Sequence, residues 1–499
     1  MSLHRLGRWL TRACAGLLGL ALALHPAAPA GAQPVDLPRL GDAGGDQLSP
    51  IAERRLGDSI MREIRRERAL LDDPELVDYL NRLAARLAAQ PSAAGFSFEL
   101  FAVEDRSINA FALPGGYIGV HTGLVASSSA ESELASVLAH ELGHVTQRHI
   151  ARMLATQQQS STVMVASLVA ALLAARSNPQ AAAGLVSLGS TVQMQQMLGH
   201  SRDAEREADR VGVEMLQQAG FDPQGMVDFF GRLQTASRLS ESALPAYLRT
   251  HPLTGERMSD IQNRVMGLRY RQHADSLEFA LLRARYRVLA DRSTDGLQRA
   301  SQLMLRSIED GAVSAMVGRY ALAAGALASG EPARARTLIG QAREASAGKS
   351  HSYIEHLAAL IELEAGDPRA ALAIADRTIA QSGVTRALSR VRVRALSEQK
   401  DWQAAVEAAA QALDSARNDT ELWGLIARAQ AARGDQAAAH VAMAELHAIN
   451  GAWTAAIEQL QAAQRTRQLD FYDSSRVDAR LRELRAIFFQ EREDRRAGR

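Results

Sequence analysis

Two histidines and a glutamate lie close together in the run His140-Glu141-Leu142-Gly143-His144. Residues 131–153 contain no proline and many helix formers, so we expect this run to lie within one helix. Histidines four residues apart share a helix face, and both imidazoles can then reach one metal ion. Glu141 could take a proton from the water that attacks a carbonyl carbon. The spacing therefore predicts zinc-dependent hydrolysis with two histidine ligands and a glutamate base.

A catalytic zinc ion needs a third protein ligand. The positions that a metzincin would fill with Gly and His are Gln147 and Ile150 in this chain. His149 follows His144 by five residues, which turns it off the ligand face of a continuous helix, so we interpret it as a solvated or packing histidine. The third ligand must therefore come from another segment.

The best candidates for that segment lie on a helix expected over residues 202–218, which Ala219-Gly220 would end. Glu205 and Asp209 are four residues apart and share one face of this helix. Glu205 could bind the metal ion, and Asp209 could accept the second ring N–H of a ligand histidine and fix its tautomer. The alternative is a charged helix face with ordinary i,i+4 pairs to Arg, and we interpret Glu207 in this way.

The elements that must position these helices begin with apolar residues at helical spacing between residues 50 and 89. Residues 96–103 alternate like a strand, and residues 117–120 continue the strand character after the turn at Pro114-Gly115-Gly116. We therefore expect a mainly helical α+β peptidase domain with a small sheet over residues 50–272.

Two apolar runs, Met164–Ala175 and Ala181–Leu188, flank the break at Asn178-Pro179. Each run is short for a membrane span, which needs about 20 residues. A buried helical hairpin is the preferred interpretation. A lid over the active site and an element that contacts a membrane are the alternatives, and the second would suit a membrane-integrated protease.

From residue 275 to 499 the chain is rich in alanine and shows a repeat. Each of five turn-like pairs is followed by an alanine five places after the first member of the pair. The pairs are Asp295-Gly296, Gly330-Glu331, Gly366-Asp367, Lys400-Asp401 and Gly434-Asp435, and the alanines are Ala300, Ala335, Ala371, Ala405 and Ala439. Small residues at fixed intervals of 34–36 let paired helices stack closely. The spacing predicts an all-α domain similar to tetratricopeptide repeats.

The first 32 residues have the character of a cleavable signal peptide, with a basic start, a short apolar stretch and small residues up to Ala32. An uncleaved membrane anchor is the alternative. Residues 33–49 are expected to form a flexible lead-in. The only cysteine, Cys14, would be removed with the signal peptide, so packing and a metal ion must stabilise the exported chain without disulfides. The net charge of +1 gives no basic field for nucleic acid, and no stable membrane span is expected.

Taken together, these motifs resemble the gluzincin family that contains HtpX and the CAAX-prenyl proteases, and within it the soluble periplasmic branch. The resemblance covers nearly the whole mature chain. Its motifs are the run His140 to His144, the helix from Ser201-Arg202 through Glu205 to Asp209, the segment from Asn109-Ala110-Phe111 through Pro114-Gly115-Gly116, and Thr250-His251-Pro252 with Arg257.

The resemblance implies that Glu205 completes a site for one Zn²⁺ per chain and that residues 109–120 supply an edge strand for extended substrate. His251 and Arg257 become candidates for stabilising the oxyanion. In a second role, His251 would occupy the open position of the zinc ion at rest and block it.

The family further implies a periplasmic zinc endopeptidase that degrades misfolded or stalled outer-membrane proteins and assists their assembly. Its expected partners are unfolded or misassembled outer-membrane proteins and, through the repeats, the outer-membrane assembly machinery, including that for lipopolysaccharide. The alternative is a chaperone or assembly scaffold that acts mainly through its repeats and cleaves only occasionally.

Overall fold

The computed structural model describes residues 48–66, 70–156, 201–239, 246–269, 271–347 and 351–496. The expected signal peptide, nearly all of the lead-in and both apolar runs between residues 164 and 188 lie outside these ranges. Residues from Gln47 onward form one compact unit. Among the described residues, no helix combines the length and the apolar character needed to cross a membrane.

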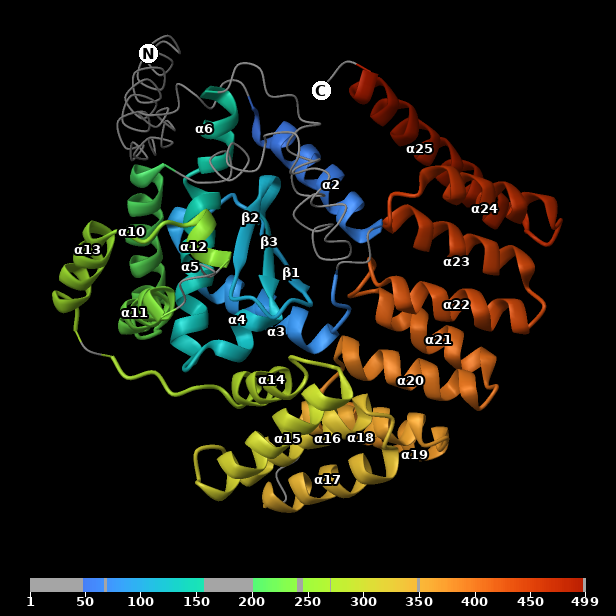
Figure 1. The fold of residues 1–499 in the computed structure, drawn as a ribbon. Helices are drawn as coiled ribbons and strands as arrows, with labels where there is room; N and C mark the ends of the chain where they lie inside the picture. Colours follow the sequence, from blue (N-terminus) through green and yellow to red (C-terminus); the bar gives the residue numbers. More distant parts are fainter. Residues whose placement is uncertain are drawn as a thin grey trace, which may run out of the picture. The chain divides into compact units, whose positions relative to one another are not determined.

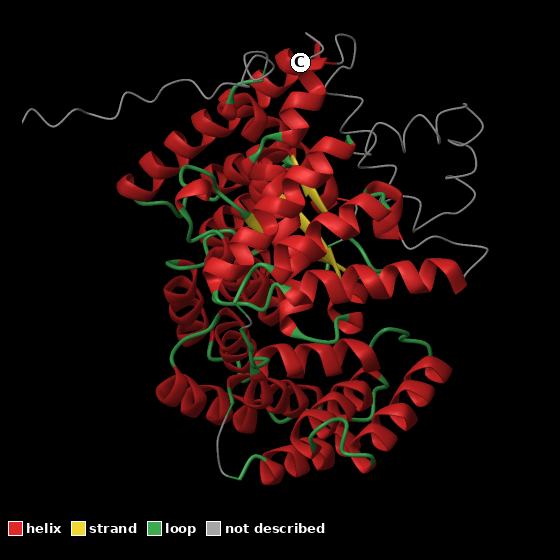
Figure 2. Cartoon of the chain, turned by 90° about the vertical axis from the view of Figure 1, so that its left-hand side faces the viewer, coloured by secondary structure: helices red, strands yellow, loops and turns green. Residues whose placement is uncertain are grey.

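A three-stranded sheet lies among the helices of the N-terminal half (Figures 1 and 2). Its strands are β1 (Glu99–Val103), β2 (Ala110–Leu113) and β3 (Tyr117–His121), in the order β1-β3-β2. β1 runs parallel to β3, and β2 runs antiparallel to it. The strand expected over 96–103 is shorter than predicted and begins at Glu99, and the strand expected over 117–120 is confirmed. Of the segment 109–120, expected to supply an edge strand, only β2 is at the edge, because β3 is the central strand.

Alternate residues of β1 belong to two different cores. Leu100 and Ala102 pack with α3 (Pro74–Leu87), whereas Phe101 and Val103 pack with α2 (Pro50–Arg66). This alternation is the period-two pattern of a strand covered on both faces. Strand β1 is therefore packed between α3 on one face and α2 on the other.

A tight turn, η3 (Pro114–Gly116), joins β2 to β3. Gly115 and Gly116 have φ of 76° and 84°, values that glycine adopts readily. A Cβ on Gly116 would lie 1.9 Å from the Ser97 carbonyl oxygen, and one on Gly57 of α2 would lie 2.1 Å from the Pro114 carbonyl oxygen. Glycine is therefore required here both by backbone conformation and by the close approach of α2.

The helices that surround the sheet and the site are mostly long and well packed. The remaining ones are α4 (Thr122–Ser127), α5 (Glu131–Thr146), α6 (His149–Thr156), α10 (Arg202–Ala219), α11 (Gln224–Leu239), α12 (Ala246–Thr250), α13 (Gly255–Met266) and the short 3-10 helix η2 (Pro91–Ala93). Every residue of α5 is buried, and α5 packs against α10, α11 and β2. Gly220 ends α10 in the left-handed conformation, as its sequence predicts.

The expectation of one helix over residues 131–153 is wrong. α5 ends at Thr146, and α6 begins at His149. Between them Arg148 has a φ of 53°, a left-handed conformation that costs a non-glycine residue about 1–2 kcal/mol. The side chain of Arg148 donates to the Leu48 carbonyl oxygen at 2.6 Å and pairs with Glu53 at 3.3 Å, which holds the break in place.

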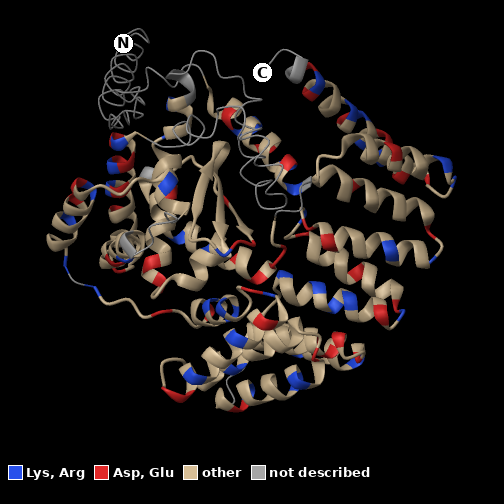
Figure 3. Ribbon diagram, viewed as in Figure 1, with Lys and Arg blue, Asp and Glu red and all other residues tan. Residues whose placement is uncertain are grey.

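The C-terminal half is an all-α array of paired helices, as expected (Figure 1). Its helices are α14 (Leu277–Val288), α15 (Thr294–Glu309), α16 (Ala315–Ala328), α17 (Pro332–Ala345), α18 (Ser352–Glu364), α19 (Pro368–Ser382), α20 (Arg386–Glu398), α21 (Trp402–Leu413), α22 (Thr420–Ala432), α23 (Gln436–Ile449), α24 (Trp453–Arg465) and α25 (Phe471–Arg496). Basic and acidic residues are spread over both halves (Figure 3).

Four of the five predicted repeat turns are confirmed. Their first residues have positive φ, and the alanines that follow are buried: the turn residues are Gly330, Gly366, Lys400 and Gly434, and the alanines are Ala335, Ala371, Ala405 and Ala439. Asp295-Gly296 is not a turn, because it lies in the first turn of α15, which the Ser293 side chain caps. Ala300 is accordingly only half-buried.

Buried ion pairs join the first array helix to α3. The Arg285 guanidinium on α14 lies 2.5 Å from both Asp73 and Glu75 at the start of α3, and His356 on α18 lies 2.9 Å from Glu75. One apolar core also continues from α3 into the array. The domain boundary expected between residues 272 and 275 stays a prediction, but side chains from both sides of it share this core.

Replacing Arg285 by Met is expected to lower the free energy of unfolding by about 3–5 kcal/mol, because the buried Glu75 and the partly buried Asp73 lose their common cation. Denaturant unfolding followed by circular dichroism measures this. Arg292→Met is a matched control, since Arg292 and its partner Glu104 are about half exposed and their pair should contribute less than about 1 kcal/mol. Equal losses in the two variants would contradict the expectation.

The last array helices contact α2. Arg62 of α2 lies 2.5 Å from Glu491 of α25, and its guanidinium lies 5.7 Å from the ring centre of Trp453. The Trp453 indole donates to the same Glu491 carboxylate at 2.8 Å. The array therefore meets the N-terminal half near both of its ends, through α14 and through α24 and α25.

Candidate metal centre

Four side chains from three segments meet at a buried point beside the sheet. His140 and His144 come from α5, Glu205 from α10, and His251 directly follows α12. One ligand atom of each lies within 4.8 Å of the others, and all four residues are at most 2% exposed. The structure thus brings together the three residues expected as ligands from the sequence and His251, which one of its two predicted roles places at the same point.

Four of the six separations between the donor atoms are close to those expected around a tetrahedral metal ion. The Nε2 atoms of His140 and His144 are 3.0 Å apart, and Glu205 Oε1 lies 3.3 Å from His144 Nε2. His251 Nδ1 lies 3.3 Å from His140 Nε2 and 3.1 Å from Glu205 Oε1. A zinc ion at about 2.0–2.1 Å from each ligand requires ligand separations of about 3.3–3.4 Å. Three imidazoles and one carboxylate are also a donor set that suits zinc better than a hard cation.

Asp209 and Arg257 contact the clustered side chains on the side away from the expected metal position: Asp209 contacts His140, and Arg257 contacts Glu205. Asp209 Oδ1 lies 2.8 Å from His140 Nδ1, the ring nitrogen that faces away from the cluster. Arg257 donates to both oxygens of Asp209 at 2.7 and 2.8 Å, to the Pro252 carbonyl oxygen at 2.8 Å, and lies 2.7 Å from Glu205 Oε2. Asp209 therefore lies where it can accept the second ring N–H of His140, as its expected role requires. The guanidinium of Arg257 is engaged within the protein, which favours a positioning role over a contact with substrate.

The charges of the cluster reinforce one another. Burial lowers the pKa of His140, but hydrogen bonds to Asp209 and Glu205 outweigh it and raise the pKa to about 9. Burial alone would raise the pKa of Glu205, but His251, His140 and His144 hold it well below its usual range. A histidine must be neutral to bind a metal ion, so metal binding at this cluster should compete with protonation of His140.

Glu141 lies beside the four clustered side chains and is not one of them. It is fully buried, its Oε1 lies 3.5 Å from His251 Nε2, and neither of its oxygens has a hydrogen-bond partner among the described residues. The Tyr247 hydroxyl is buried in the same way, and its ring stacks on His251 with centres 4.6 Å apart. Sequence reasoning missed Tyr247, although it precedes His251 by one helical turn.

His149 is the second residue whose role the sequence did not show. It is buried, with Nδ1 2.7 Å from His144 Nδ1 and Nε2 2.9 Å from Glu207 Oε2. It packs, as one of the two alternatives proposed, but it is not solvated. The break at Arg148 brings it back to the ligand side, and Glu207 is its partner instead of part of a purely solvated face.

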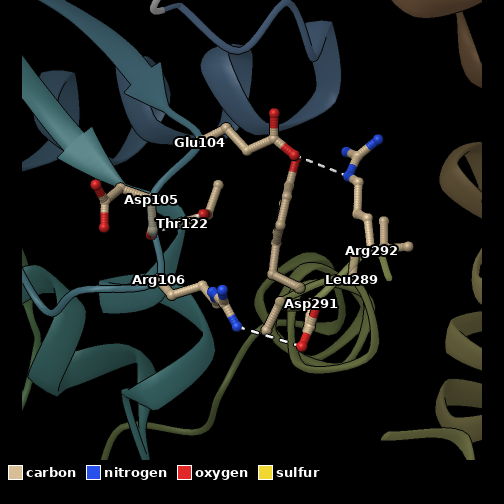
Figure 4. Close-up of a pocket in the computed structure, with 9 residues that line it drawn as sticks. Glu104, Asp105, Arg106, Thr122, Leu289, Asp291 and Arg292 are labelled. Carbon is tan, nitrogen blue, oxygen red and sulfur yellow. Dashed lines mark hydrogen bonds and ion pairs between the residues drawn. The ribbon is translucent and has the colours of Figure 1, made fainter. Parts of the chain in front are cut away.

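A separate cavity of about 410 Å³ lies between the loop after β1 and the end of α14 (Figure 4). Ion pairs Arg292–Glu104 at 2.8 Å and Arg106–Asp291 at 3.3 Å cross it. Its lining includes none of the four clustered residues and none of their partners. The chemistry therefore belongs to the buried cluster instead of this cavity.

Solved helical-repeat structures show only a distant likeness to the chain. A crystal structure of YrrB, a TPR protein with an unusual peptide-binding site, is 14% identical, covers 37% of this chain and 91% of its own, and has a TM-score of 0.29. A likeness of this size carries no argument about function.

Sequence comparisons are closer. Residues 71–265 match the model of peptidase family M48. The beta-barrel assembly-enhancing protease of Escherichia coli K12 is 31% identical over 471 residues, which is 94% of this chain and 95% of that protein. The mitochondrial metalloendopeptidase OMA1 of Schizosaccharomyces pombe is 30% identical over 213 residues, or 42% of this chain and 60% of that protein. The chain therefore belongs to peptidase family M48 and is a metalloendopeptidase.

Proposed function

We propose that the protein is a zinc-dependent endopeptidase of the bacterial periplasm that degrades misfolded or stalled outer-membrane proteins and assists their assembly. The observation that carries the proposal is the buried cluster of His140, His144 and Glu205, with Glu141 beside it, whose oxygens have no hydrogen-bond partner among the described residues. The name of the Escherichia coli relative supports the substrate class, and the signal-like residues 1–32 support export.

In this proposal, His140, His144 and Glu205 would hold a zinc ion, which would supply Lewis-acid chemistry to the scissile carbonyl and the attacking water. Glu141 takes the proton of that water and delivers it to the leaving amine. Asp209 keeps the proton of His140 on Nδ1, so that Nε2 faces the cluster. Arg257 contacts both Glu205 and Asp209 and so fixes the position of one carboxylate relative to the other.

An extended substrate would pair with the edge of β2 that β3 does not occupy. The array over residues 275–499 would bind the outer-membrane assembly machinery. We retain the boundaries 50–272 and 275–499 as part of this proposal, although the two halves share a core.

The direct test is metal analysis of the purified protein together with cleavage of an unfolded protein such as casein. We expect about one zinc ion per chain, loss of cleavage after chelation, and recovery when zinc is added back. Cleavage that persists in protein shown to contain no metal would contradict the proposal.

A second function, assembly scaffolding by the array with only occasional proteolysis, is supported by the words "assembly-enhancing" in the name of the relative. Client assembly should be compared between wild type and Glu141→Gln. Unchanged assembly in the inactive variant would assign the main role to the array.

We propose further that His251 blocks the site at rest. With His251 included, four protein atoms surround the point where zinc would bind, whereas a catalytic zinc ion keeps one position open. His251 is carried by a short helix, α12, whose Tyr247 amide donates to the Ile108 carbonyl oxygen at 3.2 Å. This blocking role is incompatible with the oxyanion role that the sequence left open.

We therefore expect His251→Ala to cleave casein, or itself, several-fold faster than wild type, because it removes a ligand that competes with substrate. Initial rates at equal zinc content measure this. His440→Ala is a control, since His440 contacts Gln459 within the array. A drop of about a hundredfold would instead favour the oxyanion role, and a rate within about twofold of wild type would assign neither role.

A further inference from the structure

The outer ring nitrogen of His144 faces another histidine, whereas that of His140 faces a carboxylate. His144 Nε2 points into the cluster, 3.0 Å from His140 Nε2 and 3.3 Å from Glu205 Oε1. Its Nδ1 lies 2.7 Å from the Nδ1 of His149. His149 is 2% exposed at its side chain and makes a second contact, from Nε2 to Glu207 Oε2, at 2.9 Å.

The positions of the ring protons on His144 and His149 follow from which nitrogen of His144 would bind the metal ion. A nitrogen that binds a metal ion offers its lone pair and carries no proton. With Nε2 of His144 as the ligand atom, the ring proton of His144 must be on Nδ1, which then donates to His149. His149 must accept with Nδ1, so its own proton is on Nε2 and is donated to Glu207.

From these contacts we infer that His149 is a positioning residue for the metal site, which fixes the tautomer and ring orientation of His144 and is itself fixed by Glu207. The inference rests on the proposed zinc peptidase function. His149 does not touch the metal position or the substrate in this arrangement. His149 accepts the Nδ1 proton of His144 as Asp209 accepts that of His140, but with a neutral ring in place of a carboxylate.

The backbone is shaped for this contact. In an unbroken helix, a residue five places after His144 would face away from it. The left-handed Arg148 returns the chain so that His149 faces His144, and the contacts of Arg148 with Leu48 and Glu53 hold that conformation. An uncommon backbone conformation with its own anchors thus serves a single side-chain contact.

Glu207, which contacts Nε2 of His149, lies at the surface and also forms an ion pair there. Glu207 is 42% exposed at its side chain and also accepts from Arg152 at 2.9 Å. Arg152 lies on α6, the same helix as His149, and Glu207 lies on α10, the same helix as the ligand Glu205. The pair therefore ties α6 to the helix that supplies the third ligand.

The test compares two substitutions of His149 by their zinc affinity. His149→Leu removes the acceptor, and we expect it to weaken zinc binding by about 10- to 100-fold. His149→Asn places an amide oxygen near the position of Nδ1, and we expect it to stay within a few-fold of wild type. Competition with a chelator of known zinc affinity measures both without reference to peptide cleavage. Circular dichroism of the zinc-free proteins checks their folding.

Two further measurements make the result decisive. Imidazole ¹⁵N shifts of the zinc-loaded wild type should show the proton of His149 on Nε2 and that of His144 on Nδ1. Glu207→Ala should weaken zinc binding less than His149→Leu does, and Glu214→Ala, an exposed carboxylate elsewhere on α10, should leave it unchanged.

Equal zinc affinity in wild type and His149→Leu would overturn the inference, as would equal losses in the Leu and Asn variants. The opposite tautomer of His149 would overturn it even if neither variant folds. Failure of the wild type to bind zinc would instead refute the proposed function, so the two failures are distinguishable.

Discussion

Glu141→Gln is expected to lower the rate of peptide cleavage by about 10²- to 10⁴-fold while zinc stays near one ion per chain. Gln has nearly the shape of Glu but cannot accept the proton of the attacking water at neutral pH. Glu141 is not among the four clustered side chains, and neither of its oxygens has a hydrogen-bond partner among the described residues. Its loss should therefore remove the base and leave the ligands intact.

Cleavage rates and zinc content must be measured on the same preparation of this variant. Glu104→Gln is a suitable control, because Glu104 lines the separate cavity and is 43% exposed at its side chain. Full activity in Glu141→Gln would exclude Glu141 as the base. Low activity accompanied by loss of zinc would place Glu141 among the ligands instead.

Glu205→Gln should weaken zinc binding and, as zinc is lost, lower the rate of peptide cleavage. Glu205 is held ionised by the surrounding histidines and lies 2.7 Å from the Arg257 guanidinium. A neutral amide is a weaker ligand for zinc and leaves Arg257 with one buried carboxylate fewer. We expect zinc affinity to fall by more than the roughly 10- to 100-fold that follows loss of a ligand's hydrogen-bonding partner.

Chelator competition gives the zinc affinity of this variant directly. Glu214→Gln, on the exposed side of the same helix, controls for a general effect of removing a charge from α10. Unchanged zinc affinity in Glu205→Gln would remove Glu205 from the ligand set and leave only histidines at the site.

The clustering of side chains from α5 and α10 could be predicted from sequence because the two residues of each pair lie within one helix. His140 and His144, and likewise Glu205 and Asp209, need only the periodicity of the helix to share a face. The side chains then meet because α5 packs directly on α10, an approach that needs small residues: a Cβ on Gly143 would lie 3.0 Å from the Ala208 carbonyl oxygen.

The end of α5 could not be predicted in the same way. Neither Gln147 nor Arg148 is a helix breaker, and a left-handed Arg is not signalled by its residue type. Its anchors, Leu48 and Glu53, are about a hundred residues away in sequence. The interpretation of His149 depended on helix continuity, and for this reason its contact with His144 was missed.

The role of His251 was left open for a related reason. His-Pro indicates a bend but not where the ring will lie. The placement depends on α12, which hydrogen-bonds to the loop before β2, and on Tyr247, which stacks on the ring. In the array, by contrast, local turn chemistry predicted four of five turns, and only Asp295-Gly296 misled because Ser293 caps a helix just before it.

The contact of α2 with the last array helices changes how the array can come apart. In an open stack of repeats, the final repeat has a neighbour on one side only, so it frays first and its amide hydrogens exchange fastest. Here Arg62 of α2 supplies a neighbour through its contacts with Glu491 and Trp453, and α2 in turn packs closely on η3 at Gly57. The last array helices are thus held from the peptidase half, and breaking the Arg62 contacts would leave them free to fray and would remove one support of α2.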